Sequence, residues 1–476
     1  MARHGAPIVR PTGRYRWRTC RRVVAAGAPL LVMLVPLVIP ASVPAAGSAT
    51  LYVDKGSPSC SNSGAGSQTQ PFCSIGTAAS KVVAGKTVLV AAGTYNETVT
   101  VSSSGTARKR VVFAAVPGAT VTITGSEGTF GYGFHMSGRS YVTVRGFNVT
   151  HTSNEGLVAT NSSHIKLSGN HVSYSGQPVP GKTANGIRKT AKGIRLENTT
   201  DSVVLGNTVD HNSSYGIYLT VGSTRNLLQG NVTFSNAFGY QRAASGIRLS
   251  NSPGNTVSSN VSHDNEDSGI EFDHSTNNLA VNNVSYNNGD HGIDNTNGAT
   301  GTRIIANTVY KNVTAGINVE GTSTGVTLAN NIAVDNGIAS PRTHSNIRVD
   351  SSSISGTTMD YELVYLTTPD TMLIWNSVGY TSLAAFRVAS GQETHGVQAD
   401  PKWVAPTSGD FHLPAGSPAI DSANSGASGQ PKHRRPDGTK RVDDPVTPNT
   451  GAGPRAYDDR GAYEFHGPAL ESKEGH

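Results

Sequence analysis

The sequence is poor in cysteine, in aromatic residues and in charged residues. Of its 476 residues, 3 are cysteines, 6% are aromatic and 15% are charged. Cys20 lies in an N-terminal leader, so Cys60 and Cys73 remain, in a stretch rich in Gly, Ser and Pro. A metal site usually needs more ligands nearby, and in an exported chain this pair therefore predicts a disulfide.

Net charge also nearly disappears once the leader is set aside. The first 46 residues contain seven arginines and no acidic residue, and the remaining residues have 31 Lys and Arg against 32 Asp and Glu. Overall charge therefore does not indicate a nucleic-acid partner. The repeated part of the chain lacks a long stretch of helical periodicity, and no Ser-His-Asp arrangement, phosphate loop or cofactor fingerprint stands out.

Residues 1–46 have the layout of a secretory signal. The arginines precede an apolar stretch, Val23–Ile39, and small residues follow it, with Val43-Pro44-Ala45 as a candidate cleavage site. Pro29 and Pro36 argue against a membrane anchor. We therefore expect an exported protein with no membrane segment in its mature form.

A repeated pattern runs from Gly133 to Asn346. It consists of Gly-Ile-x-Leu, a polar turn, an apolar patch and Asn-x-x-x-x-Asn, and four of the eight spacings between repeats are 23 residues. A period near 23 with short strands predicts a parallel β-solenoid, in which like positions stack about 4.8 Å apart. The repeats open at Gly133, Gly156, Gly193, Gly216, Gly246, Gly269, Gly292, Gly316 and Asn346.

Two sets of asparagines set the register of the repeat. Each member of the second set follows its partner in the first by five residues, which predicts two structural ladders of stacked turn residues. The first set is Asn207, Asn231, Asn260, Asn283, Asn307 and Asn331. The second set is Asn212, Asn236, Asn265, Asn288, Asn312 and Asn336.

The chain after the leader divides into three parts. Residues 47–132 are expected to form an N-terminal cap and the first coils, and they include a short helix predicted over Ile75–Val83. Residues 133–399 form the repeat domain. Residues 400–476, rich in Pro, Gly and Asp, are expected to pack along the solenoid as an irregular tail.

Three insertions fall at one corner of the repeat and span residues 176–192, 237–245 and 337–345. Stacked insertions build walls beside one face, and basic and aromatic side chains in such walls suit an anionic sugar chain. The residues expected to bind substrate there and on the adjoining strands are Lys192, Tyr218, Tyr240, Arg242 and Arg348.

The strand that opens each repeat lies beside these walls, and its alternation points one residue outward on every coil. The outward residues are His135, Val158, Arg195, Tyr218, Arg248, Glu271, Asp294, Asn318 and Arg348. Carboxylates stacked this closely repel unless a cation or flanking arginines neutralise them. Asp267 and Asp290 lie at the corner just before the rungs of Glu271 and Asp294, and calcium is a cation that suits carboxylate and carbonyl oxygens. The alternative is an Arg–carboxylate ladder that holds the coils together.

These residues support a resemblance to a known group. The repeat region resembles the right-handed parallel β-helix proteins, a group dominated by polysaccharide lyases, epimerases and hydrolases. The segment Asp290-His291-Gly292-Ile293-Asp294 is similar to the Asp-Asp-Gly-Tyr-Asp calcium segment of family 9 pectate lyases, with His291 in place of an Asp. This resemblance implies that Asp267, Asp290 and Asp294 are calcium ligands, and we predict Glu271 on the adjacent rung as a ligand with them. The next coil has Asn318 where that family carries a lysine base in Gly-Phe-Lys-Leu.

The same coils resemble alginate C5-epimerases, although Phe272-Asp273-His274 lacks the proline of their Asp-Pro-His-Glu motif. Lyases and epimerases both begin by removing the proton beside a uronate carboxylate. We predict His291 as the base, because its unperturbed pKa is near neutrality. Arg248, Arg195 or a bound calcium ion would neutralise the carboxylate.

Together these observations predict an all-β, right-handed parallel β-helix with a short N-terminal cap and an irregular C-terminal wrapping segment. We expect a secreted monomer that acts on an acidic, uronate-containing polysaccharide as a lyase. The alternatives are a glycoside hydrolase that uses Glu271 and Asp294, a uronate C5-epimerase, and a non-catalytic carbohydrate-binding or adhesin β-helix.

Overall fold

The computed structural model describes residues 50–125, 131–177, 190–237, 244–338, 340, 342–431 and 440–467. The chain divides into two units, residues 1–45 and residues 46–476. The first unit lies outside the described residues, and so does the predicted secretory signal. Within the described part of the chain, no helix has both the length and the apolar character that crossing a membrane requires.

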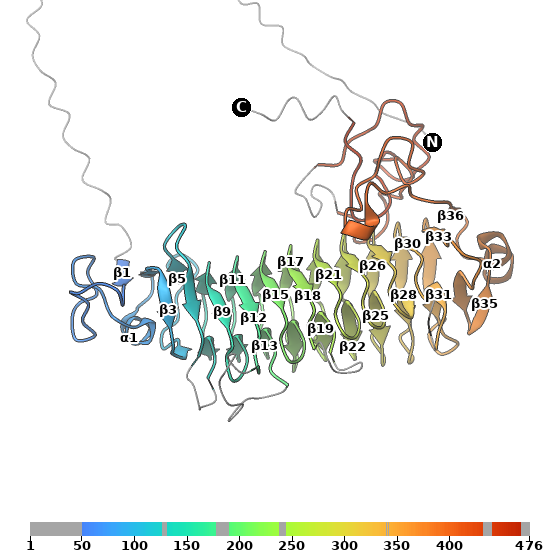
Figure 1. Ribbon diagram of the computed structural model, residues 1–476. Helices are drawn as coiled ribbons and strands as arrows, with labels where there is room; N and C mark the ends of the chain where they lie inside the picture. Colours follow the sequence, from blue (N-terminus) through green and yellow to red (C-terminus); the bar gives the residue numbers. More distant parts are fainter. Residues whose placement is uncertain are drawn as a thin grey trace, which may run out of the picture. The chain divides into compact units, whose positions relative to one another are not determined.

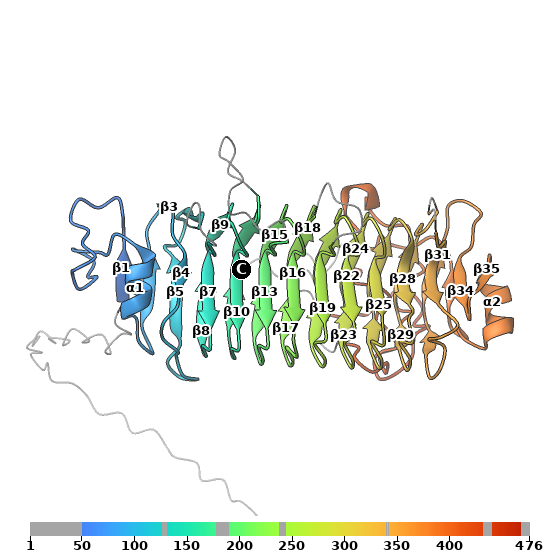
Figure 2. The same ribbon diagram turned by 90° about the horizontal axis from the view of Figure 1, so that it is seen from below.

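The described residues of the second unit form three sheets, each of 12 strands, and successive coils add one strand to each sheet until the terminal β34–β35 hairpin (Figures 1 and 2). Sheet A contains β1 (Thr50–Val53), β2 (Thr87–Val90), β5 (Val111–Ala115), β8 (Val142–Arg145), β11 (Lys166–Ser168), β14 (Val203–Leu205), β17 (Leu227–Gln229), β20 (Thr256–Ser258), β23 (Leu279–Val281), β26 (Arg303–Ile305), β29 (Thr327–Ala329) and β32 (Thr358–Asp360).

Sheet B contains β3 (Gly93–Tyr95), β6 (Val121–Ile123), β9 (Asn148–Thr150), β12 (His171–Ser173), β15 (Thr208–Asp210), β18 (Val232–Phe234), β21 (Val261–His263), β24 (Val284–Tyr286), β27 (Thr308–Tyr310), β30 (Ile332–Val334), β33 (Leu363–Tyr365) and β36 (Val397–Gln398). Sheet C contains β4 (Val99–Thr100), β7 (Phe134–Ser137), β10 (Leu157–Thr160), β13 (Ile194–Glu197), β16 (Ile217–Thr220), β19 (Ile247–Ser250), β22 (Ile270–Asp273), β25 (Ile293–Thr296), β28 (Ala315–Val319), β31 (Ser345–Val349), β34 (Leu373–Trp375) and β35 (Val378–Tyr380).

The register follows the repeat in the sequence. Ile217 pairs with Ile247, and Ile247 pairs with Ile270, always in parallel. The described strands pair in parallel throughout, apart from the terminal β34–β35 hairpin. These isoleucines are fully buried in one hydrophobic core, and burying a side chain of this size contributes about 1.5–3 kcal/mol. The predicted all-β parallel β-helix is confirmed.

Both predicted asparagine ladders are present. In the first, the Nδ2 of Asn283 donates to the Oδ1 of Asn307 at 2.9 Å and to the Val257 carbonyl at 2.9 Å. Its Oδ1 accepts the N–H of Asn260 at 2.9 Å. In the second, Asn265 bonds Asn288 in the same way at 3.0 Å. Each amide thus satisfies buried groups of neighbouring coils.

The N-terminal cap contains helix α1 (Ile75–Lys81), two residues shorter than predicted. Ser74 caps the helix, and the Glu97 carboxylate accepts the N–H groups of Ile75 and Gly76 at 2.8 and 2.7 Å. Cys60 and Cys73 form the predicted disulfide.

The C-terminal segment, defined as residues 400–431 and 440–467, has little regular structure beyond the 3-10 turn η1 (Pro406–Ser408). It follows helix α2 (Leu383–Ser390) and packs against β27, β30 and β33 of sheet B. Figure 1 shows the segment beside β30. The apolar residues that form this contact from the segment include Trp403, Phe411, Leu413 and Ile420. The segment therefore covers apolar side chains on the outer face of sheet B.

The first asparagine ladder ends in two buried glutamates. Glu362 accepts the N–H of Asn331 at 2.6 Å, and Glu393 accepts the N–H of Glu362 at 3.1 Å. Burial raises the pKa of both carboxyls, and the charge of Glu393 raises that of Glu362 further. Both carboxyl groups are therefore favoured in the protonated form.

We expect Glu393→Gln to raise the unfolding free energy at pH 7 by about 3 kcal/mol, because the pKa of Glu393 is raised from 4.5 to about 8 and each of the roughly 2.5 units between 4.5 and pH 7 is worth 1.36 kcal/mol. A raised folded-state pKa gives stability that is complete below the unfolded value and is lost as pH rises toward the folded value. The gain should therefore vanish near pH 4. Urea unfolding at pH 4 and pH 7 measures it, and an equal gain at both pH values would contradict this account.

Candidate functional site

The outer face of sheet C carries the predicted row of polar side chains. Consecutive strands align Arg248 with Glu271, Glu271 with Asp294, and Asp294 with Asn318. Figure 2 shows β16, β19, β22, β25 and β28 side by side in this order. We expected these side chains to face solvent, but Glu271 and Asp294 are buried. They are enclosed because they pack against one another and against the adjoining corner.

Arg248 is the centre of the first half of the site. Its Nη1 donates to the hydroxyl of Tyr215 at 2.8 Å and lies 3.0 Å from Oε1 of Glu271. Its Nη2 lies 2.8 Å from Oδ2 of Asp273. Tyr215 also stacks on Tyr218, with ring centroids 4.8 Å apart. Arg248 is thus fixed by two carboxylates and one phenol.

The two carboxylates around Arg248 differ in environment. Burial raises the pKa of Glu271, whose Oε2 accepts the hydroxyl of Ser245 at 2.6 Å. Burial alone would also raise the pKa of Asp273. Hydrogen bonds from Asn297 and Arg248 outweigh burial and lower this pKa to about 2. Asp273 is therefore ionised at neutral pH, and its negative charge holds Arg248.

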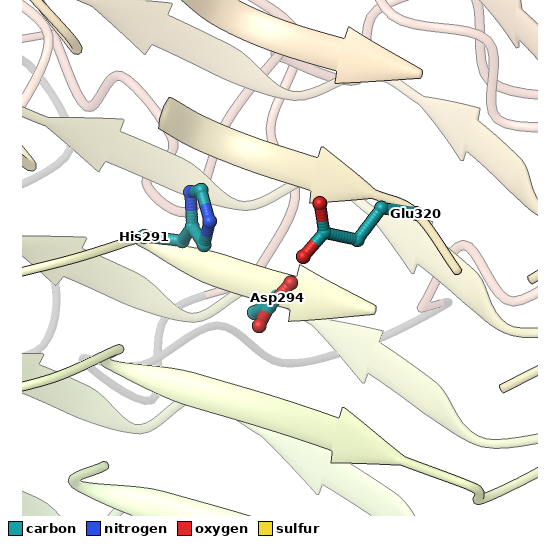
Figure 3. Close-up of side chains that lie close together, drawn as sticks. All are labelled: His291, Asp294 and Glu320. Carbon is teal, nitrogen blue, oxygen red and sulfur yellow. The ribbon is translucent and has the colours of Figure 1, made fainter. Parts of the chain in front are cut away.

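His291, Asp294 and Glu320 form the second half of the site. One ligand atom of each lies within 4.8 Å of the others, and their side chains gather between neighbouring strands in Figure 3. Nδ2 of Asn318 donates to Asp294 at 2.8 Å. Burial, together with the charges of Glu271 and Glu320, raises the pKa of Asp294 well above its usual range. Glu320 is partly exposed and lies 2.5 Å from Nη1 of Arg348.

Asp290 precedes His291 in the chain, and its carboxylate lies beside the imidazole of His291. Oδ1 of Asp290 accepts the hydroxyl of Thr314 at 2.5 Å, contacts Arg342 and lies 3.6 Å from Nε2 of His291. The same Thr314 hydroxyl bonds Nδ1 of His291 at 2.8 Å. Burial lowers the pKa of His291 to about 4, so its imidazole is neutral at pH 7.

The predicted calcium ligands do not gather around one point in the described structure. Asp294 faces His291 and Glu320, whereas Glu271 turns to Arg248 and Asp290 turns to Arg342. The main-chain carbonyl of Asp267 accepts the N–H of Asp290 at 3.2 Å. The group that the structure brings together is therefore His291, Asp294 and Glu320.

The other predicted site residues lie along the same face. Arg195 pairs with Glu155 at 3.3 Å and contacts Glu197. Lys192 lies 5.6 Å above the ring of Tyr218. Nη1 of Arg348 donates to Asn318 at 2.7 Å. Tyr240 and Arg242 lie outside the described residues.

Sequence reasoning did not select Glu320, Tyr215 or Thr314 for the site. Glu320 occupies the second outward position of its coil, and its place two rungs after Asp273 was the available signal. Thr314 lies at the corner before its strand, one coil after His291. No sequence pattern distinguishes this threonine from the many other threonines in turns.

The arrangement has an electrostatic consequence. Each of Arg195, Arg248 and Arg348 is already paired with at least one carboxylate. These arginines hold neighbouring coils together, as the Arg–carboxylate ladder in the sequence suggested. The paired carboxylates therefore neutralise part of the positive charge of these arginines.

Several solved structures are similar to this chain. Pectate lyase Pel9A shares 18% identity at a TM-score of 0.53, over 88% of this chain and 96% of that chain. The GH136 lacto-N-biosidase from Eubacterium ramulus shares 12% identity at a TM-score of 0.55, over 69% of this chain and 65% of that chain. The mannuronan C-5 epimerase AlgE4 A-module from Azotobacter vinelandii shares 15% identity at a TM-score of 0.41, over 66% and 91%.

At 18% and 12% identity, the first two of these structures show a shared fold and no particular activity. No curated protein matches the sequence. Residues 51–346 match the Pel9A-like right-handed beta helix region, and this match covers more than half of the chain. The protein belongs to the Pel9A-like right-handed β-helix family.

Proposed function

We propose that this protein cleaves a uronate-containing polysaccharide by β-elimination on the outer face of sheet C. The observation that supports this most directly is the group formed by His291, Asp294 and Glu320, within 4.8 Å of one another. It combines a titratable base with carboxylates that can hold a cation. The flanking Lys192, Tyr218 and Arg348 would contact neighbouring sugars.

The carboxylates around Asp294 suit a calcium ion. Asp294 is enclosed near three further carboxylates, Glu271, Glu320 and Asp290, all of which raise its pKa. A cation beside Asp294 and Glu320 would relieve that repulsion, and carboxylate oxygens are the ligands that calcium prefers. The imidazole nitrogen of His291 is not a typical calcium ligand, so His291 remains available as the base. Bound calcium would supply positive charge for the uronate carboxylate.

The residues of the chain would then carry out proton removal. Thr314 bonds Nδ1 of His291, so His291 would take the C5 proton at Nε2. The electron pair of the C5–H bond forms the C4–C5 double bond, the C4–O bond breaks, and the leaving oxygen takes a proton from solvent. Asp290 would orient the imidazole and stabilise the imidazolium that forms.

A glycoside hydrolase is the second candidate, and one observation favours it. Asp294 is enclosed, whereas Glu320 has 34% of its side chain exposed beside Arg348. Two carboxyls in unlike environments at a spacing of about 5 Å resemble the acid and nucleophile of retaining glycosidases. We also propose, from the sequence, that the protein is exported and acts as a monomer.

One assay separates these functions. The purified protein is incubated with a panel of uronate polysaccharides, with calcium and with a chelator, and ultraviolet absorbance is followed. We expect absorbance from unsaturated ends, lost on chelation and restored by calcium. New reducing ends without absorbance would establish the hydrolase instead, and neither signal on any polymer would favour an epimerase or a binding protein.

A further inference from the structure

An arginine or the proposed calcium ion stands on every second coil of one stretch of sheet C. Arg195 lies on β13, Arg248 on β19 and Arg348 on β31. Asp294, beside which the proposed function places the calcium ion, lies on β25, and one strand separates each of these four strands from the next (Figure 2). Because neighbouring strands lie about 4.8 Å apart, the four positions recur about every 9.6 Å along the sheet. We call the coils of β13, β19, β25 and β31 the cationic coils.

The strands between the cationic coils carry no positive charge at the same position. Their outward residues are Tyr218 on β16, Glu271 on β22 and Asn318 on β28. Burial raises the pKa of Glu271, which favours its neutral form. Lys192 lies 5.6 Å above the ring of Tyr218, but it precedes β13 and belongs to the coil of Arg195. Uncharged sugars therefore suit the intervening strands better than uronates do.

The ion pairs of the arginines do not use all of their N–H donors. A guanidinium has five N–H donors in a rigid plane. Arg195 contacts Glu155 and Glu197 through Nη1 and Nη2, and Arg348 contacts Glu320 through Nη1. Among the described residues, none accepts a hydrogen bond from Nε of Arg195 or from Nε and Nη2 of Arg348. The paired carboxylates therefore hold both guanidinium groups in place and leave donors for the carboxylate of a bound polymer.

We propose that the polymer bound on this face is one in which each uronate alternates with an uncharged sugar, with one uronate at each cationic coil. An extended 4-linked sugar is about as long as the spacing between neighbouring coils, so a disaccharide repeat spans about two coils. Guanidinium groups and calcium both bind carboxylates. The uncharged sugars would then face Tyr218, Glu271 and Asn318. This inference rests on the proposed function, which supplies the calcium ion at Asp294 and the uronate that is cleaved there.

The first measurement compares four unsulfated polymers as substrates in the presence of calcium. Two of them alternate, glucuronate with N-acetylglucosamine and galacturonate with rhamnose, and two are homopolymers, of galacturonate and of mannuronate. We expect kcat/KM, followed by ultraviolet absorbance, to be about 10-fold higher or more on an alternating polymer than on either homopolymer, because a homopolymer brings carboxylates to coils that lack a cation. Equal or faster cleavage of a homopolymer would overturn the proposal and leave the lyase in place.

The second measurement tests the spacing with Arg195→Gln. Arg195 lies four strands from Asp294 in sheet C, so a tetrasaccharide bound at Asp294 is too short to reach it, whereas a dodecasaccharide can. On an alternating dodecasaccharide we expect the variant to raise KM about 10-fold and to change kcat less than about twofold. On the tetrasaccharide both constants should stay unchanged. An arginine that only holds the coils together would affect the two substrates alike.

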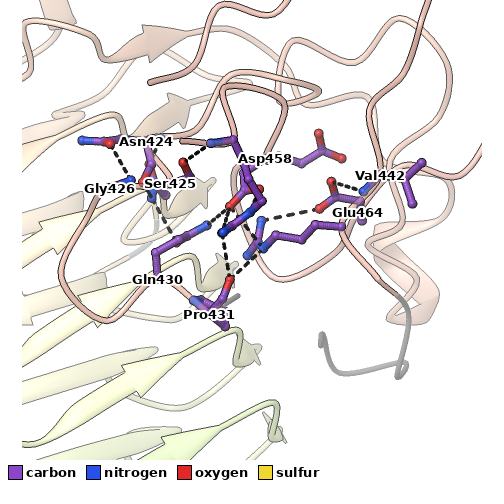
Figure 4. A network of polar contacts seen from close by, with 12 residues as sticks. Asn424, Ser425, Gly426, Gln430, Pro431, Val442, Asp458 and Glu464 are labelled. Carbon is purple, nitrogen blue, oxygen red and sulfur yellow. Dashed lines mark hydrogen bonds and ion pairs between the residues drawn. The ribbon is translucent and has the colours of Figure 1, made fainter. Parts of the chain in front are cut away.

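Arg455→Gln is the matched control. The Arg455 side chain is 18% exposed, against 22% for Arg195, and its Nη2 lies 2.8 Å from Oδ2 of the buried Asp458. This pair belongs to the polar network of the C-terminal segment that Figure 4 shows, and its loss should leave both constants unchanged on both substrates. The proposal is wrong if Arg195→Gln impairs the tetrasaccharide and the dodecasaccharide equally, or impairs neither.

A different result would contradict the proposed function alone. If no polymer is cleaved, the protein is not a lyase of these uronates, and affinity electrophoresis in gels that contain each polymer decides which polymer it binds. Stronger retardation by an alternating polymer, reduced in Arg195→Gln, would support the alternating polymer as the ligand of this face. Equal retardation by all four polymers would contradict it.

Discussion

Asp294→Asn is expected to lower turnover of the uronate polymer about 100-fold or more without lowering the unfolding temperature. The carboxamide has the same shape and keeps an oxygen for the Asn318 amide, which donates to Asp294 at 2.8 Å. It loses the charge that would hold a cation beside Glu320. Because Asp294 is enclosed near Glu271 and Glu320, removing its charge relieves repulsion in the folded state.

The measurement pairs initial rates on the polymer with unfolding monitored by circular dichroism. Asp201→Asn is the control, because this carboxylate is bound to Arg225 at 2.7 Å in an exposed turn and should leave turnover unchanged. If Asp294→Asn lost activity and stability together, the carboxylate would belong to a ladder that holds the coils. If it kept both, the face of sheet C would not be the site.

The positions of the site residues follow from the sequence to a large degree. A repeat of constant length, in which every second residue of a strand points outward, places Arg248, Glu271 and Asp294 on successive rungs. This inference needs only the register, and the asparagine ladders fix the register independently. For that reason the sequence predicted the outward row without knowledge of any side-chain contact.

The partners of those residues could not be predicted in this way. Asp290 contacts Arg342, 52 positions later in the chain, and the repeat predicts the corner at which this insertion lies but not the path of its chain. His291 lies at the corner just before its strand, and the repeat pattern does not show that this residue is only 4% exposed. Rung spacing determines which side chains are neighbours, whereas rotamers and insertions determine which of them touch.

Glu362 shows the same limit at the end of a ladder. Its position, 31 residues after Asn331, falls outside the repeat length, and a glutamate does not match the asparagine pattern. Its hydrogen bonds show that it continues the ladder, because its carboxylate accepts two bonds from Asn331 at 2.6 and 3.1 Å. Glu393 in turn accepts the N–H of Glu362, so the ladder is two rungs longer than the asparagines alone indicate.

Asn283→Asp is expected to be the most destabilising of these substitutions, by about 4 kcal/mol at pH 7. Asn283 is fully buried, and its Nδ2 donates to two acceptors, the Val257 carbonyl and Oδ1 of Asn307, each at 2.9 Å. An ionised carboxylate donates to neither, so both acceptors lose a partner and a charge is buried beside them. Asn198→Asp in an exposed turn is the control and should change stability by less than about 1 kcal/mol.

The pH dependence tests the reason for the loss. Protonation of the introduced carboxylate would restore one of the two donated bonds, so the loss should be smaller near pH 4 and should grow as pH rises. An equal loss at both pH values in urea unfolding would contradict this account. The native Glu362 is tolerated because it follows the last asparagine of the ladder: its carboxylate accepts bonds from Asn331, and only its main-chain N–H donates onward, to Glu393. An acid therefore fits beyond the last asparagine of this ladder and not in its interior.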